Sequence, residues 1–163
     1  MAIPRVHLSA SHEPLVQEEA RAVDAEDIPP LGGSHDTDVW LTEWQVAEDR
    51  FDVALGQHVA WALVPMDQDW LARMFAGRRA VALQRDTYAD ALCGTPDAPT
   101  WTHLSGRVAR IDQISVRYRP SEDPAERGLF PETGGAMQHS VLSVREPRAH
   151  HGTIAGWIVR IRA

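Results

Sequence analysis

The sequence has little or none of several residue types, and each absence excludes a kind of site or a class of protein. Cys93 is the only cysteine, which excludes an intramolecular disulfide and a cysteine-rich zinc site. No apolar run approaches the roughly 18 residues that span a bilayer, and the first residues lack the apolar core of a signal peptide. We therefore expect a soluble, cytoplasmic protein that makes no contact with a membrane.

Lysine and asparagine are absent as well, and all 16 basic residues are arginines. Because the codons for both missing residues are AT-rich, this composition indicates a gene from a GC-rich genome. The absence of lysine therefore weakens any argument that arginine was chosen at a given position for its bidentate geometry.

The net charge of −7 is concentrated near the N-terminus. Residues 1–36 contain seven acids, two arginines and no aromatic residue, and they close with proline and glycine pairs typical of a linker. Residues 37–163 hold 16 acids and 14 arginines, so this part is nearly neutral. The pattern predicts an acidic tail over 1–36 and a single β-rich domain over 37–163. The tail is interpreted either as a solvated leader or as a segment that docks on a partner.

Alternating apolar residues predict five or six short strands in the body of the chain. One helix is expected near 67–76, because Asp67 can cap it, an apolar stripe follows, and Gly77 can end it. Residues 79–92 fit either a strand or a helix. The fold class is therefore mainly β (or α+β), as a small bent antiparallel sheet or an SH3-like barrel. The expected strands cover residues 39–45, 58–64, 101–111, 114–119 after a short turn, 138–145 and 157–162.

Two aromatic motifs open the body of the chain, Trp40-x-x-x-Trp44-Gln45 and Gly56-x-x-Val59-x-Trp61-x-Leu63. With the blocks around Ser105-Gly106-Arg107 and Gly156-Trp157, they resemble an actinobacterial family of small uncharacterised domains. The resemblance covers roughly residues 39–163 and implies a shared core. It implies no activity, because the family has none established. Family members often carry adjacent cysteines after the W-Q pair, where this chain has Val46-Ala47-Glu48, so the resemblance implies no thiol chemistry here.

Residues with catalytic or metal-binding chemistry show no recognised spacing. The eight histidines form no H-x-x-x-H or H-E-x-x-H pattern, so we expect no metal and no cofactor. No G-x-S-x-G elbow occurs, and a lone Cys93 is interpreted as a small hydrophobic residue. A small enzyme built from dispersed residues stays open as an alternative, with candidates His58, His103, His139 and Arg117.

Arginines at alternate positions of the expected strands are the most distinctive polar feature. If those strands pair, one sheet face carries a row of guanidinium groups that can hold phosphates or an acidic peptide, and the acidic tail could cover it. A solvated sheet face predicts the same alternation. Trp40 and Trp44 lie four apart and are expected on one face of a strand, where they could line a ligand groove. The candidate binding residues are thus Arg107, Arg117, Arg119, Arg160, Arg162, Trp40 and Trp44.

The leading hypothesis is a non-catalytic interaction module that binds a protein partner and is regulated by its acidic tail. It is favoured because no catalytic pattern is found. The alternatives are binding of nucleic acid or a phosphate ligand through the arginine-lined face, which the negative net charge disfavours, and the dispersed-residue enzyme.

Overall fold

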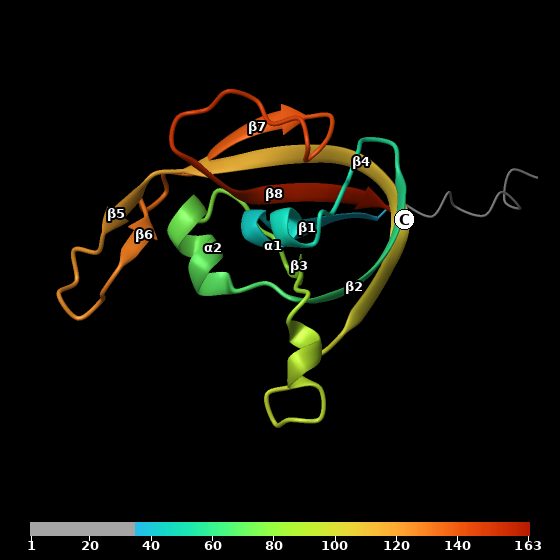
Figure 1. The fold of residues 1–163 in the computed structure, drawn as a ribbon, viewed down its shortest axis with the longest axis horizontal. Helices are drawn as coiled ribbons and strands as arrows, with labels where there is room; N and C mark the ends of the chain where they lie inside the picture. Colours follow the sequence, from blue (N-terminus) through green and yellow to red (C-terminus); the bar gives the residue numbers. More distant parts are fainter. Residues whose placement is uncertain (1–34) are drawn as a thin grey trace, which may run out of the picture. The chain divides into compact units, whose positions relative to one another are not determined.

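The computed structural model describes residues 35–163, so the expected tail lies outside the described residues except for its last two positions. The described part is mainly β, which confirms the predicted fold class (Figure 1). Its elements are β1 (Asp36–Thr42), α1 (Glu43–Glu48), β2 (His58–Pro65), α2 (Gln68–Phe75), β3 (Leu83–Arg85), the 3-10 helix η1 (Ala89–Leu92), β4 (Thr102–Val116), β5 (Tyr118–Pro120), β6 (Leu129–Pro131), β7 (Met137–Val141) and β8 (Thr153–Arg162).

The main sheet has six strands in the order β2-β3-β1-β8-β4-β7, and β2 also pairs with β4. The pairings therefore form a closed circuit, with β7 attached outside it and a separate β5–β6 hairpin. The long strand β4 makes this closure, because its first half pairs with β2 and its second half with β8 (Figure 1). β1 and β3 are parallel, so the sheet is mixed and the expected all-antiparallel pairing is wrong.

Both faces of the sheet are covered by apolar side chains. Successive residues of β1 divide between the two sides, since Val39 and Leu41 belong to one core cluster and Trp40 to the other. The first cluster also holds Trp157, Val159 and Ile161, at alternate positions of β8. The second lies against α2 and adds Ile158 from the opposite face of β8.

Helix α2 lies where the sequence predicts it. The Asp67 carboxylate accepts hydrogen bonds from the backbone N–H groups of Asp69 and Trp70, both at 3.0 Å, and so caps the first turn. Ala76 adopts a left-handed conformation at the other end, and Gly77 follows with φ 81°. The apolar stripe of this helix is therefore anchored at both ends.

The turn expected between two strands near residue 112 does not exist, because β4 runs unbroken from Thr102 to Val116. Asp112 and Gln113 are fully buried in the middle of this strand. The Gln113 side chain forms two hydrogen bonds with the backbone of Arg148, at 2.9 and 3.2 Å, and so replaces the solvent that a turn would offer. Two register shifts against β8 bend the strand instead.

The strand expected over residues 39–45 is also wrong in its second half. β1 ends at Thr42, and Trp44 and Gln45 belong to the short helix α1. Gln45 is held there by its side-chain amide, which donates to Asp86 at 3.0 Å. The two tryptophans of the first motif therefore do not share one strand face.

Candidate functional site

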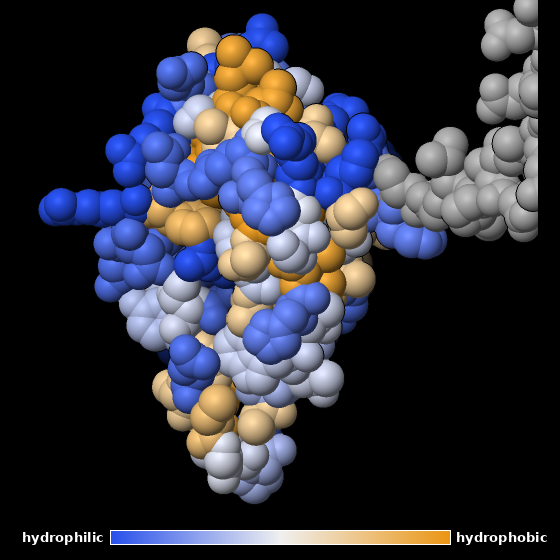
Figure 2. All heavy atoms as spheres, turned by 90° about the vertical axis from the view of Figure 1, so that its right-hand side faces the viewer, coloured by the Kyte–Doolittle hydropathy of each residue, from blue (hydrophilic) through white to orange (hydrophobic). Residues whose placement is uncertain are grey.

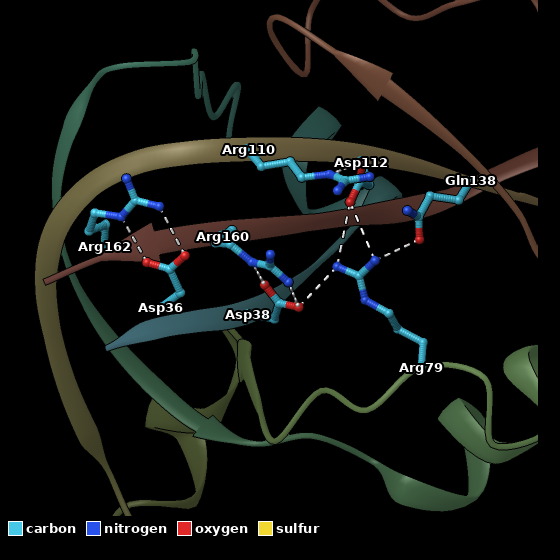
Figure 3. Close-up of polar contacts among 8 residues, drawn as sticks. All are labelled: Asp36, Asp38, Arg79, Arg110, Asp112, Gln138, Arg160 and Arg162. Atoms are coloured by element: carbon cyan, nitrogen blue, oxygen red, sulfur yellow. Dashed lines mark hydrogen bonds and ion pairs between the residues drawn. The ribbon is translucent and has the colours of Figure 1, made fainter. Parts of the chain in front are cut away.

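Two of the predicted binding arginines, Arg160 and Arg162, lie on β8 opposite aspartates of β1. The antiparallel register places Asp38 against Arg160 and Asp36 against Arg162. Each arginine donates from Nε and Nη2 to the two oxygens of its aspartate, at 2.8 and 3.1 Å in the first pair and 2.9 and 3.1 Å in the second (Figure 3). The guanidinium groups are thus engaged by bidentate ion pairs within the domain.

The same network continues inward through Arg79, which lies between α2 and β3. Arg79 donates to Asp38 at 2.9 Å, to Asp112 at 3.4 Å and to Gln138 at 2.7 Å (Figure 3). Burial raises the pKa of Asp38, but the hydrogen bonds and charges of Arg160 and Arg79 outweigh this and hold the pKa below its usual value. The acid that compensates this face therefore comes from within the domain.

The other predicted arginines do not extend this face into one stripe. Arg107 lies across from Arg162 and donates to the backbone oxygen of Gly56. Arg117 follows the end of β4, and Arg119 belongs to the β5–β6 hairpin, where it contacts Glu132 at 3.5 Å. The arginine surface that the alternation predicted is therefore divided and largely compensated by carboxylates.

A different feature brings the predicted tryptophans together. A groove of about 480 Å³ lies between α1, the start of α2, β5 and the start of β8. We name it the aromatic groove; the aromatic and acidic residues that line it are Trp40, Trp44, Trp70, Tyr118, Glu43 and Asp67. Trp40 and Trp44 share it although they belong to a strand and a helix.

The elements around the aromatic groove fix its rings in different ways. Trp40 is 1% exposed, and its Nε1 donates to the Thr42 hydroxyl at 3.0 Å. Trp44 is 50% exposed and packs against Tyr88 with 5.3 Å between ring centroids. The Tyr88 hydroxyl donates in turn to Glu48 at 2.6 Å, which braces the exposed ring from behind. The groove thus has a rigid floor and a braced, solvent-exposed wall.

The charge of the aromatic groove is negative. None of the arginines or histidines in residues 35–163 lines it. Asp67 uses one carboxylate oxygen to cap α2, whereas the side chain of the half-buried Glu43 forms no hydrogen bond or ion pair with the described residues. Burial, and then the negative charge of Glu43, raise the pKa of the Tyr118 hydroxyl. The groove therefore combines π faces with a carboxylate that has no partner in residues 35–163, which is the chemistry that attracts a cation.

Nothing in the sequence patterns indicated this combination. Trp70 falls in the apolar stripe expected near 67–76, and Tyr118 in the strand expected over 114–119. The one signal in the sequence was the pair Trp40 and Trp44, which were expected to line a ligand groove, although on one strand face rather than on a strand and a helix.

The candidate histidines of the dispersed enzyme do not meet. His58 lies 3.2 Å from the Ser105 hydroxyl, and His103 lies opposite Ala62 further along the same strand pair. The register separates these two histidines by four residues, or about 13 Å. His139 lies on β7, opposite Gln113. No group of three or more histidine, cysteine or acidic side chains among residues 35–163 is arranged to hold a metal ion.

The face of the domain that carries β2 and the bend of β4 offers no broad apolar surface. Figure 2 shows this side, and its hydrophobic colour is confined to separate patches between hydrophilic side chains.

The fold and the groove define a small β-rich domain with an acidic, aromatic-lined surface groove. A family of unknown function, DUF6578, matches residues 35–163, and the chain belongs to that family. No curated protein and no solved structure matches the chain. None of the helices in the described residues is long and apolar enough to cross a membrane.

Proposed function

We propose that this protein is a non-catalytic interaction module whose aromatic groove binds a cationic segment of a protein partner. The observation that supports this most strongly is the half-buried Glu43 carboxylate, which has no partner among the described residues and lies in a groove lined by three tryptophans and a tyrosine. An arginine or lysine side chain entering the groove would meet both the carboxylate and the π faces. Such cation–π contacts contribute roughly 0.5–2 kcal/mol each, depending on desolvation.

The groove also suits an extended segment better than a compact ligand. Trp44, the exposed wall, is braced by Tyr88, so an aromatic surface of two rings continues beyond the groove. Aromatic surfaces of this kind hold peptides in extended or polyproline conformations. We propose that the partner is a basic peptide segment, and that recognition takes place in the cytoplasm of an actinobacterial cell.

Binding of nucleic acid or a phosphate ligand remains the alternative proposal. Among the described residues, Arg107 is the one predicted arginine of the β4–β8 face with no carboxylate partner, while Arg160 and Arg162 are held in bidentate pairs. A phosphate would have to displace those pairs. The structure therefore favours the peptide over the polyanion.

Fluorescence titration with short peptides tests the proposal. A peptide rich in arginine and lysine should quench the exposed tryptophan, whereas a peptide of the same length with glutamine in their place should not. Glu43→Gln and Trp44→Ala should each weaken binding by about tenfold, since each removes on the order of 1.4 kcal/mol of cation attraction. Because Trp44 also supplies the fluorescence signal, peptide binding to the Trp44→Ala variant is measured by calorimetry.

Glu122→Gln is the matched control, because Glu122 is exposed and lies in a different pocket. Circular dichroism should show all three variants folded. If Glu43→Gln binds the basic peptide as tightly as Glu122→Gln does, the groove is not the peptide site. Binding of single-stranded DNA with a steep salt dependence, unaffected by Glu43→Gln, would support the alternative instead.

A further inference from the structure

A second half-buried charge, the Arg85 guanidinium, lies outside the aromatic groove. Arg85 ends β3, where its backbone pairs with Leu41 of β1, and its side chain forms no hydrogen bond or ion pair with the described residues. Its guanidinium carbon lies 3.6 Å from the centre of the Phe51 ring and 5.9 Å from that of Trp61. The Nη1 atom is fully buried without an acceptor. An arginine has five N–H donors and stays charged in proteins, so this side chain has unused binding capacity.

The lack of a partner is unusual within this domain. Among the half-buried aspartates, glutamates and arginines of residues 35–163, all others take part in a hydrogen bond or ion pair, and only Arg85 and Glu43 do not. Burial lowers the pKa of Arg85, and the charge of Asp49 offsets this only in part. The positive charge is therefore held in an environment that favours the approach of an anion.

Arg85 lines a groove of about 490 Å³ between β2, the start of β4 and the segment that carries η1. Trp61 and Trp101 contribute aromatic surface, and His103 and Thr87 contribute polar groups. Two acids also line the groove. Asp86 is already engaged, since it accepts from Gln45 at 3.0 Å and from the backbone of Tyr88 at 2.9 Å, while Asp90 is exposed.

We propose that this second groove binds a small ligand that carries a carboxylate or phosphate group beside a planar ring. The oxyanion would accept hydrogen bonds from Arg85, and the ring would lie against the tryptophan surface. Thr87 and His103 supply further donors to the same group. A ligand without the anionic group would leave Arg85 unpaired. The anionic group is therefore the part of the ligand that decides affinity.

This site is independent of the aromatic groove, although the two are close in sequence. Gln84 and Arg85 are neighbours on β3 and therefore point to opposite faces; Gln84 lines the aromatic groove and Arg85 lines the second groove. One site carries an unpaired carboxylate and the other an unpaired guanidinium. They are expected to select ligands of opposite charge.

The test is a titration of the isotope-labelled protein followed by NMR, with benzoate, phenyl phosphate, inorganic phosphate and benzylamine as probes. Benzoate and phenyl phosphate are expected to shift the backbone signals of residues 83–87, the Arg85 Nε–H and the Trp101 indole N–H. Benzylamine has the same ring with a positive charge and should leave these signals in place. A stronger response to phenyl phosphate than to benzoate identifies phosphate as the preferred group, and inorganic phosphate shows whether the ring is required.

Arg85→Met keeps the length of the side chain and removes its charge and donors. We expect it to weaken benzoate binding at least about tenfold, the usual effect of losing a charge-assisted hydrogen bond. Arg85→Lys keeps the positive charge but loses the bidentate donor geometry of the guanidinium, and should give an intermediate affinity. If the methionine variant does not fold, the lysine variant tests whether Arg85 binds the anion. Arg117→Met, at an exposed arginine outside this groove, is the matched control. The proposal is overturned if neither aromatic anion moves the Arg85 signals, or if Arg85→Met binds them as well as Arg117→Met.

Discussion

The buried carboxylate of Asp112 is the position where the structure makes its largest energetic prediction. Asp112 is fully buried in the middle of β4. It accepts from Arg110 Nε at 2.8 Å, from the Ser140 hydroxyl at 3.0 Å and from both terminal nitrogens of Arg79 at 3.4 Å. Asp112→Asn keeps the shape, removes the charge, and turns an N–H₂ group toward a cation that needs an acceptor.

The expected loss of stability depends on the contacts that Arg79 and Arg110 keep in the Asp112→Asn variant. Removing one member of a buried ion pair costs about 3–5 kcal/mol. Arg79 retains its contact with Asp38 at 2.9 Å, and Arg110 is partly exposed to solvent, so the lower end of that range, about 3 kcal/mol, is expected. For a domain of this size each kcal/mol shifts the melting temperature by about 4 °C. The expected decrease in melting temperature is therefore about 12 °C.

Urea unfolding followed by tryptophan fluorescence measures this change directly. Asp52→Asn is the matched control, since Asp52 contacts Arg145 at 3.4 Å with both side chains more than half exposed. Such surface pairs contribute about 0–1 kcal/mol. If Asp112→Asn loses no more stability than Asp52→Asn, then the network around β4 does not hold the buried charge as described, and the reasoning is refuted.

Two further predictions concern β1 and β8. Gly156→Ala places a methyl group against the Leu41 backbone oxygen and 2.6 Å from Cζ2 of Trp40. We expect the free energy of unfolding in urea to fall by about 2–3 kcal/mol. An unchanged midpoint would show that β1 and β8 are less tightly packed than described. Asp38 has a folded-state pKa below its unfolded value, so its contribution is fully present above the unfolded pKa and is lost as the pH falls through the folded one. Asp38→Asn should therefore be less stable than the native protein at pH 6, with a difference that shrinks below about pH 4; a difference that stays constant down to pH 2.5 contradicts this.

The sequence predicted those elements whose stabilising contacts are local. Helix α2 carries its own cap at Asp67 and its own end signal at Gly77. Strand β8 shows one of its two buried faces by alternation alone, as in Trp157, Val159 and Ile161. In these segments a few residues contain the whole physical reason for the structure, so their prediction did not depend on the rest of the chain.

The errors arose where partners lie far away in the sequence. Two polar residues at 112–113 resembled a turn, yet Asp112 is satisfied by Ser140 and Arg79 as well as by nearby Arg110, and Gln113 is satisfied by the backbone of Arg148. Helix α1 was interpreted as a strand because Trp44 favours β structure, whereas its placement depends on the bond between Gln45 and Asp86. No local pattern records such long-range hydrogen bonds.

Contacts between distant segments also explain why the predicted arginines do not form the candidate site. Alternation correctly placed Arg160 and Arg162 on one face of β8, but it contained no information that Asp36 and Asp38 lie opposite them on β1. Because these aspartates neutralise the arginines, a row of charged residues does not by itself indicate a binding surface. A partly buried charge without a partner is the better indication, because its burial is costly unless a ligand supplies the missing contact.

Within residues 35–163 that criterion selects two side chains, Glu43 and Arg85. Each lies in a groove beside tryptophan rings, and the two charges are opposite in sign. Random surface charge would place unpaired groups mainly in full contact with water, as at Arg117. The coincidence of missing partner, partial burial and aromatic walls at both positions is therefore what supports the two proposed recognition sites, one for a cation and one for an anion.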